Sequence, residues 1–160
     1  MKPEFRKIQV SDDLILAKII RNSLEEYNVA RPGTVYFDES TDHLSNIFKT
    51  AGSVYYVALE GTKVVGGSGI FPTAGLPDKT CELVKMYLVP EARGKGYGRL
   101  LIEMCINFAI QNGYTNLYLE SMPELKTAIK LYERLGFKHL TEPMGNSGHF
   151  GCDIRMIKEL

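Results

Sequence analysis

The sequence lacks the cysteine pairs and the apolar segments that mark secreted or membrane-spanning chains. Its three cysteines, Cys81, Cys105 and Cys152, are odd in number and widely spaced. We therefore expect free thiols in a reducing, cytoplasmic setting rather than a disulfide framework. No apolar run approaches the ~18 residues needed to span a membrane. The first residues, "MKPEFRKIQV", also lack the apolar core of a signal peptide.

An excess of charge is missing as well, since 19 lysine and arginine residues balance 19 aspartate and glutamate residues. This balance argues against a nucleic-acid-binding surface spread over the whole protein, although it leaves room for a local basic site. No repeat, linker or low-complexity segment interrupts the 160 residues. The length and the 44% of hydrophobic residues predict one globular domain, residues 1–160, with no nucleic acid and no membrane as partner.

Hydrophobic patterning predicts a mixed α/β fold. Strands are expected at residues 5–10, 53–60, 63–71, 80–89, 115–120, 137–140 and 151–160. Helices are expected at about 11–27, in a short segment ending near 50, at about 98–112 and at about 122–135. Ser11 is expected to cap the first helix, and Ser121 with Glu124 to form a capping box for the last one.

The stretch "VPEARGKGYGRLLIEM", residues 89–104, places three glycines between an apolar strand and a predicted helix. A dinucleotide fingerprint that starts at Gly94 and Gly96 needs a third glycine at the position of Arg99. A P-loop needs Ser or Thr after Gly94-Lys95, and the chain has Gly96 there. Spacing therefore excludes both of these phosphate-binding motifs.

The same stretch still has the physical properties of an anion site. Glycine lets backbone amides converge on a ligand, and a helix that begins near Gly98 adds unpaired N–H groups and the positive end of its dipole. Arg93, Lys95 and Arg99 supply positive charge. On spacing alone, a glycine-rich turn with solvated basic side chains is the alternative.

Two blocks of the sequence resemble a known family. "YLVPEARGKGYGRLLIEM" is similar to the acetyl-coenzyme A motif of the GCN5-related N-acetyltransferases (GNAT superfamily), with Arg93, Gly96 and Gly98 at the motif positions. "AIKLYERLGFKHL", residues 128–140, resembles a second block of the same family, in the same order. The resemblance implies a twisted mixed sheet of about seven strands with about four helices, in which parallel fourth and fifth strands splay apart.

The resemblance also implies which residues hold acetyl-CoA. The backbone of Met86, Tyr87 and Leu88 should pair with the pantetheine arm. The pyrophosphate should lie on the segment made of Arg93, Gly94, Lys95, Gly96, Tyr97, Gly98 and Arg99. Many relatives have an asparagine seven residues before the tyrosine of the second block, where this chain has Leu125.

Chemistry sets the demands on the catalytic residues. An alkyl amine with a pKa of ~10.4 is mostly protonated at pH 7, so a base must take its proton, and the leaving thiolate benefits from an acid. The resemblance implies Tyr132 as this acid and the N–H of Leu88 as the donor to the carbonyl oxygen. Glu82 and Glu120 are the candidate bases, because different relatives use one position or the other. Structural carboxylates at both positions, with water alone or another group as base, are the alternative.

The acceptor site and the metal question depend on weaker signals. His43, His139 and His149 have no metal-ligand spacing with one another or with the cysteines, so no metal is expected. His149 lies in the loop where this family often shapes its acceptor site. The loop around Arg31, Tyr36 and Phe37 is the other candidate wall, with Arg31 available to an acidic substrate.

These features favour an acetyl-CoA-dependent N-acetyltransferase that acts on a primary amine of a small molecule. The two candidate substrate loops are long enough to enclose a ligand, and no acidic patch for basic peptides is visible. A protein or peptide acetyltransferase, and an acyl-CoA-binding sensor without turnover, are the alternatives. The resemblance also allows a homodimer, since many relatives dimerise through their last strands.

Overall fold

Seven strands and four α-helices make up the computed structural model, which describes residues 2–160. The helices are α1 (Asp13–Glu26), α2 (Leu44–Ile47), α3 (Tyr97–Gln111) and α4 (Lys126–Arg134). The strands are β1 (Pro3–Lys7), β2 (Val54–Glu60), β3 (Lys63–Phe71), β4 (Thr80–Leu88), β5 (Asn116–Ser121), β6 (Lys138–Leu140) and β7 (Ile154–Glu159). They form one sheet in the order β1-β2-β3-β4-β5-β7-β6. The predicted mixed α/β architecture is confirmed.

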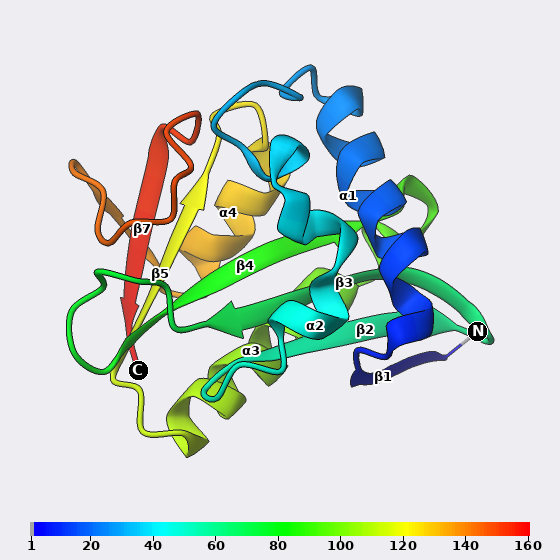
Figure 1. Ribbon diagram of the computed structural model, residues 1–160, viewed down its shortest axis with the longest axis horizontal. Helices are drawn as coiled ribbons and strands as arrows, with labels where there is room; N and C mark the ends of the chain where they lie inside the picture. Colours follow the sequence, from blue (N-terminus) through cyan, green and yellow to red (C-terminus); the bar gives the residue numbers. More distant parts are fainter. Residues whose placement is uncertain (1) are drawn as a thin grey trace.

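The pairing of β4 with β5 is the one parallel contact within this described sheet, and it is short. Only Thr80–Glu82 of β4 pair with Asn116–Tyr118 of β5. Beyond these residues the two strands separate, and Figure 1 shows β5 rising away from β4. The predicted splay is therefore present.

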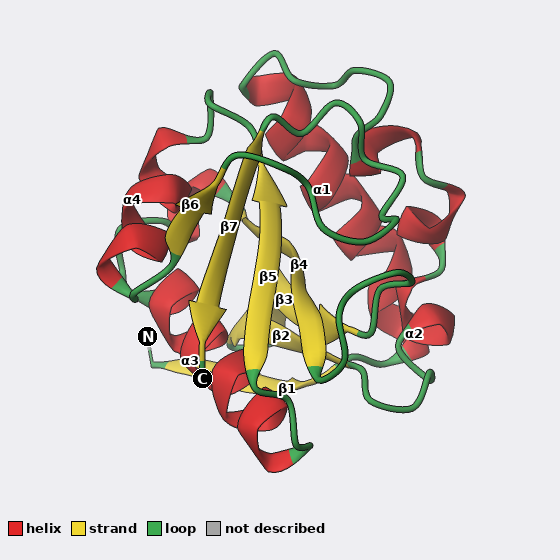
Figure 2. Cartoon of the chain, turned by 90° about the vertical axis from the view of Figure 1, so that its left-hand side faces the viewer, coloured by secondary structure: helices red, strands yellow, loops and turns green. Residues whose placement is uncertain are grey.

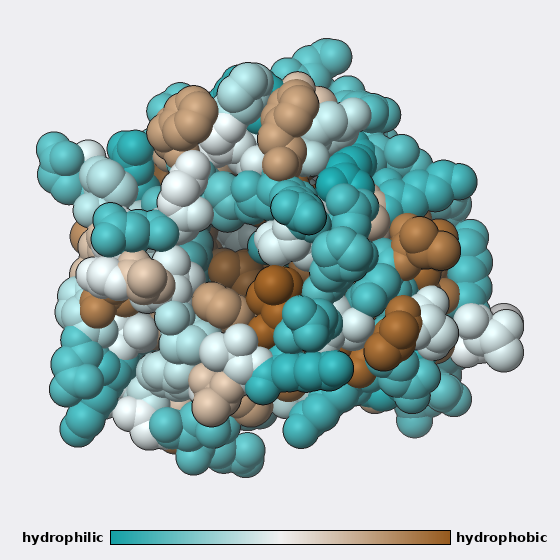
Figure 3. Space-filling model, viewed as in Figure 1, coloured by the Kyte–Doolittle hydropathy of each residue, from teal (hydrophilic) through white to brown (hydrophobic). Residues whose placement is uncertain are grey.

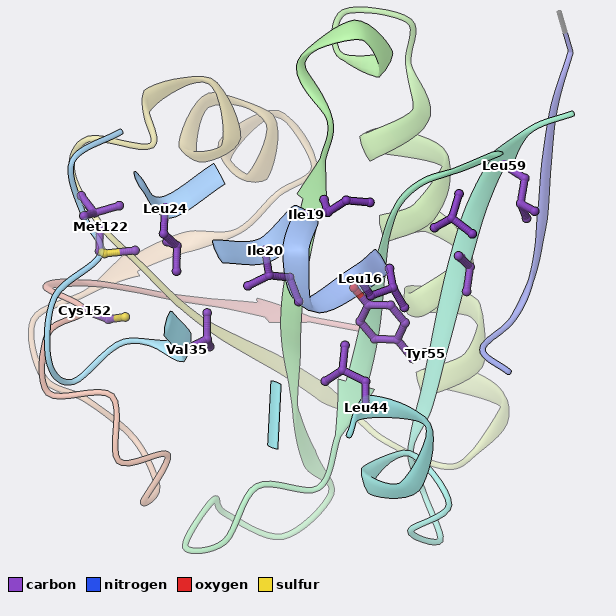
Figure 4. Close-up of a cluster of buried hydrophobic side chains, with 13 residues drawn as sticks. Leu16, Ile19, Ile20, Leu24, Val35, Leu44, Tyr55, Leu59, Met122 and Cys152 are labelled. Atoms are coloured by element: carbon purple, nitrogen blue, oxygen red, sulfur yellow. The ribbon is translucent and has the colours of Figure 1, made fainter. Parts of the chain in front are cut away.

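Helices cover both faces of the sheet. Leu16, Ile20 and Leu24 of α1 belong to one buried cluster that also contains Tyr55 and Val57 of β2. Figure 4 shows this cluster. On the opposite face, α3 and α4 cover a second cluster that includes Ile102, Cys105 and Tyr132. Figure 2 shows the sheet from the side of β7 and β5. The three cysteines are free and buried, as expected, and no helix within residues 2–160 is long and apolar enough to cross a membrane.

Two helix starts differ from the predictions. The chain before α1 forms a 3₁₀ turn at Val10–Asp12, where the Asp12 carboxylate accepts the Gln9 N–H at 2.8 Å and binds Arg6 at 2.7 Å. Ser11 lies inside this turn and caps nothing. The capping box predicted for the last helix is also wrong.

The helix α4 starts later than predicted, because Ser121, which was predicted to cap it, belongs to β5. Ser121 pairs with Ile154 of β7, so it belongs to the sheet. A turn closed by the Leu125 N–H on the Met122 carbonyl then delays the helix until Lys126. Sheet pairing has therefore overridden a local capping preference.

The glycines of β3 serve a close approach between strands. Register shifts lie between Ala58 and Leu59 on β2 and between Gly67 and Gly69 on β3. A Cβ on Gly66 would lie 2.2 Å from the Tyr87 carbonyl oxygen, and φ at Gly66 is +155°. Only glycine fits here without displacing β4.

We expect Gly66→Ala to lower the free energy of unfolding by more than Gly148→Ala. Gly148 also has a positive φ, +79°, but nothing lies within 4 Å of its added Cβ. The control therefore measures left-handed strain of about 1–2 kcal/mol, and Gly66→Ala adds overpacking of about 1–3 kcal/mol. Urea unfolding followed by circular dichroism checks this. Equal losses in the two variants would contradict the close approach.

Candidate active site

The gap between β4 and β5 is a cavity of about 640 Å³. Residues from β4, the start of α3, the end of β5, α4 and the loops at 34–35 and 149–152 line it. In Figure 3 the face that carries α1 and α2 is hollowed near its middle, with apolar side chains at the floor. The cavity therefore joins two ends with different chemistry, one at α3 and one beside the β4–β5 contact.

The end at α3 has the properties of an anion site. Gly94 and Gly96 adopt φ values of +74° and +84°, and nothing lies within 4 Å of a Cβ built on either. Gly96 is the N-cap of α3, and no side chain caps the helix. The N–H groups of its first turn therefore remain available to a ligand, at the positive end of the helix dipole.

The three basic residues of the glycine stretch are partnered with acids. Arg93 contacts Glu26 at 2.6 Å, Lys95 contacts Glu60 at 2.8 Å and Arg99 contacts Glu103 at 2.9 Å. Nine of the ten residues predicted to bind acetyl-CoA line the cavity, and Lys95 is the exception. Lys95 instead packs with Tyr97 and Glu60. The binding roles of all ten remain predictions.

Backbone groups of β4 face the gap. The Val89 N–H donates to the Val65 carbonyl on the β3 side, and backbone groups alternate in direction along a strand. The N–H and C=O groups of Leu88 therefore point away from β3. The Leu88 carbonyl accepts a hydrogen bond from Arg93 Nε at 3.0 Å. The backbone of Tyr87 faces β3, opposite Gly67. Leu88, rather than Tyr87, has its N–H open to a ligand.

The two candidate bases lie together at the other end. Glu82 is 3% exposed, and its carboxylate accepts the Thr73 hydroxyl at 2.6 Å. Burial, together with the charge of Glu120, raises the pKa of Glu82 to about 7, although the bond from Thr73 opposes this. Glu120 accepts the Tyr118 hydroxyl at 2.8 Å and also the Ser147 hydroxyl. Glu82 is therefore poised to exchange a proton near neutral pH.

Tyr132 of α4 is a further lining residue of the cavity. It is 7% exposed, lines the cavity and is held edge-on by Phe137 at a centroid distance of 5.8 Å. Burial raises the pKa of the Tyr132 hydroxyl well above its usual value. The hydroxyl is therefore protonated at neutral pH and able to donate.

The loop predicted as the other wall does line the cavity, but through Thr34 and Val35 rather than through the three side chains named for it. Arg31 donates to the Gly151 carbonyl and pairs with Glu124 at 3.6 Å, Tyr36 donates to Glu25 at 2.5 Å, and Phe37 is 61% exposed. None of the three lines the cavity. Arg31 and Tyr36 are hydrogen-bonded or ion-paired to other residues of the chain. These long-range partners could not be predicted from the sequence.

His149, from the loop that the resemblance implied as part of the acceptor site, lines this end of the cavity, and its partner Asp38 was not predicted. His149 bonds Asp38 at 2.6 Å, and Gly151 N–H donates to the Gly33 carbonyl at 2.8 Å. We call these contacts between residues 31–38 and 147–151 the loop clasp. Glu82, Glu120 and His149 each offer one ligand atom, and these three atoms lie within 4.8 Å of one another. Such a group suits an ammonium or a metal ion. The spacing of histidines and cysteines in the sequence could not predict this group, because it includes two glutamates from separate strands.

Comparison with known proteins identifies the family. The family model described as "Acetyltransferase (GNAT) family" matches residues 18–137. The chain belongs to the GNAT family. Its sheet with parallel β4 and β5, its glycine-rich helix start and its Tyr132 block all lie within or beside the matched residues.

Individual relatives of this GNAT chain are acetyltransferases by name. "Uncharacterized N-acetyltransferase YjgM" of Escherichia coli (strain K12) is 38% identical over 159 residues, 99% of this chain and 95% of that protein. Human "N-acetylaspartate synthetase" is 35% identical over 102 residues, 64% of this chain and 32% of that protein. The PaiA N-acetyltransferase of Thermoplasma acidophilum, solved with coenzyme A, matches with a TM-score of 0.78 at 19% identity, over 100% of both chains.

The anion end predicts a matched pair of variants. Gly96→Glu places a carboxylate where an anion should bind, whereas Gly113→Glu, at the other end of α3, has a similar φ of +81° and equally open surroundings. Both carry the same backbone strain. We expect only Gly96→Glu to weaken binding of coenzyme A, at least about tenfold, which corresponds to ~1.4 kcal/mol. Isothermal titration calorimetry checks this, and equal affinities in the two variants would place the cofactor elsewhere.

Proposed function

We propose that this GNAT chain is an acetyl-CoA-dependent N-acetyltransferase whose acceptor is a primary amine on a small molecule. The observation that carries the proposal is the single cavity that connects the uncapped start of α3 with Tyr132 and the buried Glu82. The coenzyme A bound to the PaiA structure of the same fold supports the cofactor. A binding protein without turnover would not need a proton acceptor and a proton donor on the same cavity.

Groups at two places along the cavity support the proposed cofactor. The bare amides at Gly94 and Gly96 suit a pyrophosphate, and the open N–H of Leu88 suits a carbonyl oxygen that gains negative charge. Bound acetyl-CoA would supply the acetyl group as a thioester. Leu125 leaves the side of α4 apolar at the place where many relatives carry an asparagine.

The proton transfers follow from the two buried groups. Glu82, with its pKa raised to about 7, takes a proton from the acceptor ammonium so that the free amine can attack. The Tyr132 hydroxyl gives a proton to the departing sulfur. Glu120 lies beside Glu82 and binds the same ammonium before it loses the proton, which is the role we assign to it in preference to that of base.

A small acceptor is favoured by the shape of the site. The loop clasp, held by Asp38–His149 and Gly33–Gly151, places His149 on the wall of the cavity. We expect this wall to limit access for a folded protein. The similarity to a protein named N-acetylaspartate synthetase, whose product is a small molecule, supports the same choice.

Thiol release from acetyl-CoA tests the reaction directly. We expect release with at least one amine in a screen of amino acids, polyamines, amino sugars and peptides. Tyr132→Phe should lower kcat by about 100-fold with little change in KM, because the hydroxyl acts in the transition state. Tyr114→Phe, outside the cavity, is the control. Tight binding of coenzyme A without release from any amine would favour a sensor, and an unchanged kcat in Tyr132→Phe would remove this residue from catalysis.

The pH profile distinguishes the two candidate bases. Because the base must be deprotonated, kcat/KM should rise as pH increases through about 7, the pKa of Glu82. Glu82→Gln should abolish this limb. Glu120→Gln should move the limb to lower pH, since the charge of Glu120 raises the pKa of Glu82. If Glu120 were the base, the limb would disappear in Glu120→Gln and only shift in Glu82→Gln.

A further inference from the structure

Lys85 is a charged residue of the cavity that the proposed reaction does not use. It is partly buried, lines the cavity and lies three residues after Glu82 on β4. Within residues 2–160 its ammonium has no hydrogen-bond or ion-pair partner, although the charges of Asp38 and Glu82 act on it. Burial lowers the pKa of Lys85, while the charges of Asp38 and Glu82 act in the opposite direction.

The backbone of Lys85 adopts an energetically unfavourable conformation. Its φ is +53°, in the left-handed region that side chains rarely adopt. The residue sits where the β3–β4 register shifts, and its carbonyl accepts the Tyr55 hydroxyl at 2.8 Å. The extra residue also reverses the alternation of β4: Leu83 packs in the cluster under α3, whereas Tyr87 packs in the cluster under α1. Such strained positions persist where the surrounding structure requires them, commonly at binding sites.

The charges around Lys85 select the kind of ligand. Asp38, Glu82 and Glu120 present three carboxylates at this end, and all three already accept hydrogen bonds. The other lysines and arginines that line the cavity, Arg93, Arg99, Lys130 and Arg134, belong to the start of α3 and to α4. One unpaired ammonium among three carboxylates suits a singly charged anion, because a phosphate dianion would be repelled by the acids.

We infer that the acceptor is a small aminocarboxylate, whose ammonium lies against Glu82 and Glu120 and whose carboxylate pairs with the ammonium of Lys85. The inference rests on the proposed function and narrows its acceptor. Two side chains of β4 then bind the two ends of the substrate: Glu82 binds the ammonium, and Lys85 binds the carboxylate. The partly buried Lys85 thereby gains a directly paired counter-ion for its ammonium.

Paired acceptors test this inference. Each L-amino acid that releases thiol is compared with the amine that remains when hydrogen replaces its α-carboxylate, such as valine with isobutylamine and phenylalanine with phenethylamine. EDTA in the assay removes metal ions from the carboxylates. We expect kcat/KM to favour the amino acid at least about tenfold, mainly through KM. Lys85→Met should remove most of this preference, and Lys85→Arg should keep it.

Lys79→Met is the matched control, because Lys79 is an exposed lysine with a similar φ of +56°. It should leave the preference unchanged, and the affinity of every variant for coenzyme A is measured to show that the fold persists. Equal kcat/KM within the pairs, or an undiminished preference in Lys85→Met, would overturn the inference. An acetyl group found on Lys85 by peptide mass spectrometry after incubation with acetyl-CoA alone would also overturn it. If no amine or amino acid releases thiol while coenzyme A still binds, the proposed acetyltransfer itself fails.

Discussion

The short parallel contact between β4 and β5 is the constraint on which the rest of the site depends. Three residues of each strand pair, and then the strands diverge. Backbone groups beyond the contact lose their strand partner, and unpaired buried N–H and C=O groups are costly. A ligand with its own amides and carbonyls can satisfy them. The gap therefore leaves strand groups open to a ligand, and it opens directly onto the uncapped start of α3.

The last paired residue of the same contact, Glu82, lies in low-dielectric surroundings. Glu82 is paired with β5 at its backbone, through Tyr118, while its side chain is buried against Thr73 and Glu120. Desolvation and a neighbouring like charge both favour the neutral form of a carboxyl. A residue fixed by sheet pairing thus acquires a proton affinity matched to neutral pH. Position and reactivity arise from one structural feature.

Local sequence predicted the parts that are contiguous in the chain. The glycine stretch specified the start of α3, because Gly94 and Gly96 need left-handed φ values and nothing fills the space before them. The order of strands and helices, and Tyr132 facing the cavity, also followed from motif and period. Predicted helix starts were wrong where long-range contacts determined the structure. Ser121, for example, pairs with Ile154 and therefore belongs to β5 instead of capping the last helix.

The acceptor end was less accessible to sequence analysis, because its parts come from distant segments. Asp38 and His149 are 111 residues apart, and neither belongs to a motif. The bulge at Lys85 arises from the register of β3 on β4, which no local preference specifies. Arg31 had the right chemistry but was engaged by Gly151 and Glu124. Charge and spacing in the sequence therefore indicate candidate site residues, and tertiary packing determines which of them line the cavity.

The loop clasp has a consequence for how the molecule assembles. Residues 86–99, which form the anion end, are neighbours in the chain, and their long-range partners Glu26, Glu60 and Val65 all precede them. The clasp instead joins residues 31–38 to 147–151, across most of the chain. Closing so long a loop carries an entropic cost that only the finished sheet can offset. The clasp should therefore be among the last contacts to form during folding. By the same logic, the clasp is a part of the structure that can open locally while the rest stays native.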